Sequence, residues 1–117
     1  MSEAHRAMMD RAPIELLEFE SRRDGMIHAM DGGLWLHRHV WKGTPMAHLV
    51  STNRLLLLEY GRSVGLPATR LQFKPLKDPR TGQRRDAWHW DLVSRFLPPA
   101  MARNALVPSS RSIDRSR

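Results

Sequence analysis

The sequence predicts an α+β fold: a small mixed sheet with a β-hairpin over residues 26–41, one well-defined helix over 54–64 packed on the sheet, and a disordered C-terminal tail. Three observations support this class. Residues 34–41 alternate between two sets of side chains, as a strand does, and residues 88–92 alternate large side chains in the same way. Residues 54–64 have helical spacing and a capping residue at each end.

The N-terminal segment is the least defined. Residues 1–12 have no clear period and are predicted to be a flexible arm. Residues 13–23 fit a helix that starts at Pro13 and stops at Gly25, but they fit a strand as well.

The hairpin prediction depends on a turn signal. Residues 26–30 are a short strand candidate, and Asp31-Gly32-Gly33 is a strong turn sequence before the strand at 34–41. The side chains of this second strand fall on two faces: Leu34, Leu36, Arg38 and Val40 on one, and Trp35, His37, His39 and Trp41 on the other. Both faces are partly apolar, as in a central strand buried on both sides.

The helix over 54–64 follows a short strand over 47–50. Asn53 is a good N-cap, and Gly65 is the residue type favoured just after a helix. Gly61 on the inner face would allow the helix to approach the sheet closely. The expected core residues are Leu49, Leu57, Tyr60, Val64, Leu71 and Trp90.

Downstream, Pro75 makes 71–76 an edge-strand candidate, and 77–86 is a polar loop. Residues 100–106 are predicted to form one or two helical turns. These elements make a single domain over 13–107, followed by a Ser/Arg-rich tail over 108–117 that is too polar to pack.

Composition narrows the class of protein. The 117 residues suit one domain, and the absence of cysteine excludes disulfides, thiolate zinc sites and a cysteine nucleophile. No apolar run is long enough for a membrane span, so the cytoplasm is the expected location. No Gly-rich phosphate loop, nucleophile elbow or His-Glu-x-x-His motif is present, which argues against nucleotide-dependent kinases, serine hydrolases and zinc proteases.

Positive charge is concentrated in the second half of the chain. Residues 1–60 carry seven Lys and Arg against eight Asp and Glu, whereas 61–117 carry twelve against four. Nucleic acid or another polyanion is therefore an expected partner, although a solvated loop would explain the charges as well. The candidate polyanion-binding residues, besides the tail, are Arg70, Lys74, Lys77, Arg80, Arg84 and Arg85.

His89-Trp90-Asp91 is the sharpest candidate for chemistry. On a strand, His89 and Asp91 share one face while Trp90 occupies the other. A histidine beside a carboxylate can ligate a divalent metal or form an acid–base pair. Alternatively, Trp90 packs in the core while His89 and Asp91 hydrogen-bond to each other or to the backbone.

Two further groups of residues are candidates. His48 with Ser51, Thr52 and Asn53 borders the free N–H groups of the following helix, which favours an anion site or simple capping. His37 and His39 share a strand face and, with His48 or Asp91 as a third ligand, could hold zinc, nickel or iron. The alternative for this pair is an exposed aromatic and imidazole surface that stacks on unpaired bases.

Residues 48–92 resemble a bacterial and phage family catalogued as domain of unknown function 4031. The motifs that carry the resemblance are, in order, His48-Leu49, Leu57 and Tyr60, Gly65-Leu66, Leu71-Gln72, and His89-Trp90-Asp91. Pro98 and Pro99 depart from the family, which continues into a basic helix. The resemblance implies a small αβ fold for this part of the chain, with His48, Gln72, His89 and Asp91 close together.

Three functional hypotheses follow. The first is a basic module that binds a polyanion through 70–85 and the tail. The second is a small enzyme with catalytic His48, His89 and Asp91 that acts on a phosphate-bearing or nucleotide-like substrate, with a divalent metal as the cofactor that these residues could hold. The third is an accessory phage or bacterial module that binds another protein.

Overall fold

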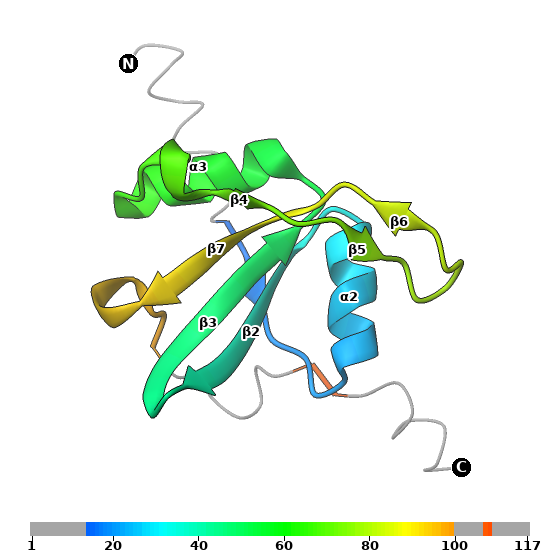
Figure 1. Cartoon of the computed structure of the whole chain (residues 1–117), viewed down its shortest axis with the longest axis horizontal. Helices are drawn as coiled ribbons and strands as arrows, with labels where there is room; N and C mark the ends of the chain where they lie inside the picture. Colours follow the sequence, from blue (N-terminus) through cyan, green and yellow to red (C-terminus); the bar gives the residue numbers. More distant parts are fainter. Residues whose placement is uncertain (1–13, 100–106, 109–117) are drawn as a thin grey trace, which may run out of the picture.

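The computed structural model describes residues 14–99 and 107–108, and it confirms the α+β class. A five-stranded mixed sheet has the spatial order β1 (Leu16–Leu17), β2 (Leu34–Trp41), β3 (Thr44–Ser51), β7 (Trp88–Val93) and β4 (Gln72–Phe73). Figure 1 shows β2, β3 and β7 side by side, with helices α2 (Arg22–Met30) and α3 (Arg54–Val64) packed on them. A separate hairpin consists of β5 (Leu76–Lys77) and β6 (Arg84–Arg85), and two short 3₁₀ turns are η1 (Ala68–Arg70) and η2 (Ser94–Phe96).

The hairpin lies one element later than predicted. The strand over 34–41 is confirmed, but its antiparallel partner is β3, not residues 26–30. Lys42 and Gly43 connect the two strands with φ angles of 48° and 80°. Two consecutive residues with positive φ make the turn whose twist matches a hairpin. The predicted hairpin over 26–41 is therefore wrong in position, and Asp31-Gly32-Gly33 instead joins a helix to a strand.

Residues 26–30 belong to helix α2, which starts at Arg22. The Ser21 side chain caps this helix by accepting a hydrogen bond from the Asp24 N–H at 3.2 Å. Gly25 does not stop the helix. A Cβ at this position would overlap the Trp35 ring, so glycine lets α2 lie directly on β2. The sequence left open whether residues 13–23 form a helix or a strand. In the structure, Leu16–Leu17 is a short strand and the helix begins only at Arg22.

Helix α3 has the predicted bounds and caps. Asn53 Oδ1 accepts a hydrogen bond from the Leu56 N–H at 3.1 Å, and Gly65 has a φ of 86°. Leu57 is fully buried, and its carbonyl accepts a hydrogen bond from Trp90 Nε1 at 2.8 Å. Gly61 lies against the Trp90 ring, as the predicted close approach requires.

The main core lies between α3 and the sheet. Leu49, Leu57 and Trp90 are buried there, with Tyr60 and Leu71 partly buried against them. Val64 was expected in this core, but it is 38% exposed. The chain reverses at Gly65, and Leu66 takes the buried position instead.

The segment around Pro75 is an edge, as predicted, but it is split. Pro75 has no N–H to donate, and β4 ends before it while β5 starts after it. The loop predicted over 77–86 is shorter than expected because its ends pair, Leu76 with Arg85 and Lys77 with Arg84.

Arg38 joins distant parts of the chain on the α3 side of the sheet. Its Nε donates to Glu18 Oε1 at 2.9 Å, and its Nη1 and Nη2 donate to the carbonyls of Pro98 and Pro99 at 2.9 and 2.7 Å. Val107 forms a parallel bridge with Phe19, two residues after β1. Both ends of the described chain are thus attached beside β2 and β1.

The predicted N-terminal arm over 1–12, the helical turns over 100–106 and the tail after Pro108 lie outside the described residues. Within the described ranges, no helix has the length and apolar character that a membrane span needs.

Candidate metal centre

Strand register places the candidate residues on one face of the sheet. His48 in β3 pairs with Asp91 in β7, and His89 lies two residues before Asp91 on the same strand. His37 in β2 pairs with His48, and Gln72 in β4 pairs with His89. Directly paired residues share a face, so four strands contribute to this surface, which we call the histidine face.

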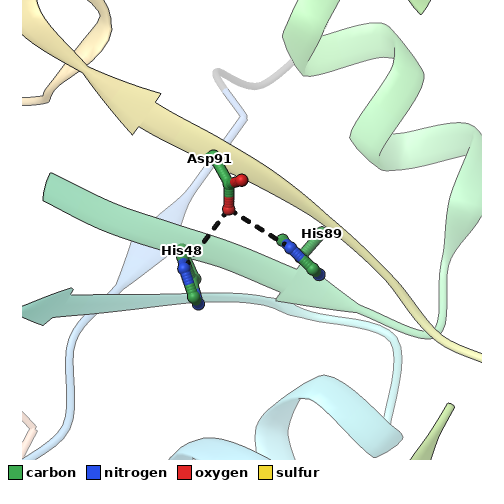
Figure 2. Close-up of side chains that lie close together, drawn as sticks. All are labelled: His48, His89 and Asp91. Carbon is green, nitrogen blue, oxygen red and sulfur yellow. Dashed lines mark ion pairs between the residues drawn. The ribbon is translucent and has the colours of Figure 1, made fainter. Parts of the chain in front are cut away.

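Asp91 lies between two imidazoles. Its Oδ1 is 3.2 Å from His48 Nε2 and 3.2 Å from His89 Nε2. Figure 2 shows the carboxylate directed toward both imidazoles. One ligand atom from each of the three residues lies within 4.8 Å of the others. The predicted proximity of His48, His89 and Asp91 is confirmed, although they are spread over more than 40 residues of sequence.

Gln72 holds the other carboxylate oxygen. Its Nε2 donates to Asp91 Oδ2 at 2.7 Å. Oδ1 therefore stays directed at the two histidines while Oδ2 is occupied. Gln72 thus lies close to His48, His89 and Asp91, as predicted.

Both imidazoles near Asp91 favour their neutral form. Burial lowers the pKa of His48 and of His89 below the usual histidine value, and Asp91 only partly offsets this effect. The neighbouring imidazoles of His89, His39 and His37 lower the pKa of His48 further, and the Lys74 ammonium lowers that of His89. A neutral imidazole in contact with Asp91 donates its Nε2–H to the carboxylate and keeps its lone pair on Nδ1, so a cation bound by Nε2 would take the place of that proton.

The other histidines of this face lie beside the cluster. The His39 ring meets the His48 ring edge-on with centroids 4.5 Å apart, and His37 stacks on Trp35 at 5.1 Å. Among the described residues, neither His37 nor His39 belongs to a group of three ligand atoms close enough to hold a metal. Trp35 is buried under α2, whereas Trp41 at the hairpin tip is 62% exposed, so the two tryptophans do not form one stacking surface.

A pocket of about 290 Å³ opens over the histidine face. The imidazoles form part of its wall, and Trp35, Val50 and Leu76 supply an apolar part. Arg22 from α2 and Lys74, which follows β4, line it as well. The cluster is therefore accessible to a small ligand.

Ligand spacing tests whether a metal ion fits. Atoms about 2.0–2.2 Å from a tetrahedral ion lie about 3.3–3.5 Å from one another. The two 3.2 Å separations from Asp91 Oδ1 are close to this spacing, and the ligand nitrogens of the two histidines lie within 4.8 Å of each other. Two nitrogens and one oxygen form the donor set of catalytic zinc and of some iron sites, which keep a position for water or substrate.

The basic residues predicted to bind polyanions have different environments. Arg80 is bound to two carboxylates, Asp78 and Asp31, each at 3.0 Å, and Arg85 donates to the Met30 carbonyl at 3.4 Å. These two attach the β5–β6 hairpin to the end of α2. Lys74 lines the pocket. All six predicted residues are exposed, including the remaining three, Arg70, Lys77 and Arg84.

The residues before α3 serve local structure. The Ser51 hydroxyl, fully buried, accepts from the Asn53 N–H at 2.9 Å, and Asn53 caps the helix. Thr52 Oγ1 donates to the Ala29 carbonyl at 2.8 Å. Ser51 pairs with Trp88, on the sheet face opposite His48, so the expected grouping of His48 with Ser51 at the helix terminus does not form.

Arg22 is the charged pocket residue that the sequence did not single out. The only available signal was Ser21 followed three residues later by Asp24, a pattern typical of a helix start, which would have placed Arg22 at the first helical position.

No protein-family model matches this chain, and no curated protein matches it. The resemblance to family 4031 therefore stays a prediction.

Proposed function

We propose that this protein is a small metal-dependent enzyme that acts on a phosphate-bearing substrate, with a divalent transition-metal ion held by His48, His89 and Asp91. The observation that carries the proposal is the convergence of three ligand atoms within 4.8 Å, from two strands, beside an open pocket that His48 and His89 line.

The donor set favours zinc or a neighbouring transition metal over magnesium or calcium. Magnesium and calcium prefer sites built almost entirely from oxygen, whereas two neutral imidazoles suit Zn²⁺, Ni²⁺ and Fe²⁺. Gln72 supports the same assignment, because metal-ligating carboxylates are themselves usually held by a hydrogen bond.

The pocket supports a phosphate-bearing substrate. A divalent ion at the cluster would act as a Lewis acid on a phosphoryl oxygen. Arg22 and Lys74 line the same pocket and can bind further phosphate oxygens. His48, His89 and Asp91 then hold the ion, and these two cations orient the substrate.

Metal binding is tested by calorimetric titration of the chelator-treated protein with Zn²⁺. We expect one strong site, which His48→Ala and Asp91→Asn each weaken at least about tenfold through loss of a ligand. The zinc-loaded protein is then assayed with p-nitrophenyl phosphate, and hydrolysis should disappear in Asp91→Asn.

His28→Ala is the matched control, because His28 packs on Phe19, away from the histidine face. It should bind Zn²⁺ like the parent protein. Unchanged zinc affinity in both His48→Ala and Asp91→Asn would refute the metal centre.

A second candidate function, polyanion binding, is supported by the exposure of Arg70, Lys77 and Arg84. We propose that these residues contact phosphates without reading sequence. Affinity for a random-sequence oligonucleotide should fall steeply with salt, and Arg70→Met with Arg84→Met should reduce the slope. Absence of binding at low salt would exclude this function.

A further inference from the structure

Two cationic side chains reach the metal-centre pocket from separate elements. Arg22 is the first residue of α2, and Lys74 lies between β4 and β5. Both side chains line the pocket that also contains His48 and His89. The pocket therefore combines two positive charges with a candidate metal centre.

Contacts with neighbouring elements hold Arg22 and the backbone of Lys74 in place. The Arg22 guanidinium lies over the Trp35 ring, 5.7 Å from its centroid, which is within the range of a cation–π contact. The Lys74 N–H donates to the Ala87 carbonyl at 2.8 Å, which attaches its backbone to the segment just before β7. The two anchors place both charges at the pocket wall.

Charge and size restrict the ligand. A divalent ion, Arg22 and Lys74 together outweigh the single carboxylate of Asp91, so the loaded pocket is strongly positive. A phosphomonoester carries about −1.5 to −2 charges at pH 7, while an internal phosphodiester carries only about −1. The volume of about 290 Å³ is at the small end of ligand pockets, which suits a terminal phosphate with a compact group attached.

We propose that Arg22 and Lys74 form the phosphate-binding subsite of this pocket and select a terminal phosphomonoester over a phosphodiester. This inference rests on the proposed function, since the metal ion supplies the third positive centre. The Arg22 guanidinium binds two phosphate oxygens through its planar fork, and the Lys74 ammonium binds as a point charge.

The test is calorimetric titration of the zinc-loaded protein with phenyl phosphate and with methyl phenyl phosphate, a monoester and a diester of similar size. We expect the monoester to bind at least about tenfold more tightly, because its higher charge matches the pocket. Arg22→Met and Lys74→Met should each weaken monoester binding about tenfold, and Lys74→Arg should restore most of it.

Matched controls separate the subsite from general positive charge. Lys42→Met, in the β2–β3 turn, and Arg62→Met, on α3, remove the same charges outside the pocket. Neither should change binding by more than about twofold, because exposed charges at a distance are screened by salt. Equal losses in control and pocket variants, or equal affinity for both esters, would overturn the proposal.

Different results would contradict the proposed metal centre and the proposed phosphate-binding subsite. If Zn²⁺ binding is intact but phenyl phosphate does not bind, the subsite is wrong and the metal centre stands. If Zn²⁺ does not bind but Lys74→Met still weakens phenyl phosphate binding, the subsite stands without the metal.

A second pair of probes distinguishes the source of the phosphate. A 5′-phosphorylated oligonucleotide that binds more tightly than its unphosphorylated counterpart, with the difference lost in Lys74→Met, identifies a polynucleotide end. Equal affinity for the two oligonucleotides, with phenyl phosphate still bound, identifies a small phosphorylated molecule.

Discussion

Asp91 uses its two carboxylate oxygens for different purposes. Oδ1 faces His48 and His89, and Oδ2 accepts the hydrogen bond from Gln72. Asp91 itself is on an exposed part of β7, where a free carboxylate would rotate. Gln72 therefore acts as a positioning residue: it fixes the oxygen that the metal ion would use.

Gln72→Ala should lower zinc affinity about tenfold, since it frees Asp91 to rotate away from the imidazoles. The unfolding midpoint without metal should hardly change, because Gln72 is exposed. Zinc titration and thermal denaturation of the same variant measure the two effects. Gln83→Ala, in the β5–β6 loop, is the matched control, and the idea fails if both variants bind zinc like the parent protein.

The candidate site was only partly predictable from the sequence. His48, His89 and Asp91 could be grouped because the helix over 54–64 was expected to pack on a sheet in which the strands before and after it are neighbours, whereas Gln72 was added only by the resemblance to family 4031. Strand alternation then gave the shared face of His89 and Asp91. Arg22 could not be placed, since its position depends on how α2 packs against β2, which no local pattern contains.

At the scale of elements, both helices meet the sheet through a glycine under a tryptophan. Gly25 of α2 lies against Trp35, and Gly61 of α3 lies against Trp90. Both tryptophans are almost fully buried. The glycines therefore set the distance between each helix and the sheet, at a cost in helix propensity of about 1 kcal/mol each.

Gly61→Ala should reduce the free energy of unfolding by about 1–3 kcal/mol, although alanine is the better helix former. The added methyl group would overlap the Trp90 ring, so either the helix or the ring has to move. Urea denaturation measures the change. Arg62→Ala, on the exposed side of α3, should stay within about 0.5 kcal/mol of the parent. A stabilised Gly61→Ala would show that α3 does not approach the sheet this closely.

The contrast between the two helices explains which elements were predictable. Helix α3 has eleven residues, an N-cap and a left-handed glycine after its end, and its bounds were predicted correctly. Helix α2 has only nine residues, with a glycine in its middle, so local sequence favoured a stop and a strand. Tertiary packing of Gly25 on Trp35 overrides that local preference.

At the scale of the whole molecule, histidines couple stability to pH. Burial lowers the pKa of His28, His37, His48 and His89 in the folded protein below the usual 6.5. The unfolded chain therefore binds more protons than the folded protein in mildly acidic solution. The stability that depends on these histidines being neutral is fully present above about pH 7 and declines as the pH falls through 6.5.

His28 offers a test that leaves the metal centre intact. Burial is the main cause of its lowered pKa, and Glu15 and Asp31 oppose it only in part. His28→Gln should make the decline in unfolding free energy between pH 7.5 and 5.5 shallower than in the parent protein. Urea denaturation at both pH values, with chelator present, gives the comparison. Parallel declines in the two proteins would show that His28 does not contribute.

The contacts of Arg38 indicate where the chain could be circularly permuted. A single guanidinium on β2 binds Glu18 and the carbonyls of Pro98 and Pro99, so segments some 80 residues apart in sequence are close in space. A short linker could therefore connect residues near 18 and 99, while a new start is opened in the exposed loop around Gly82. Such a circular permutant loses the two-residue strand β1, which precedes residue 18, but it keeps the pairings among β2, β3, β7 and β4, because neither the junction nor the cut falls within one of these four strands.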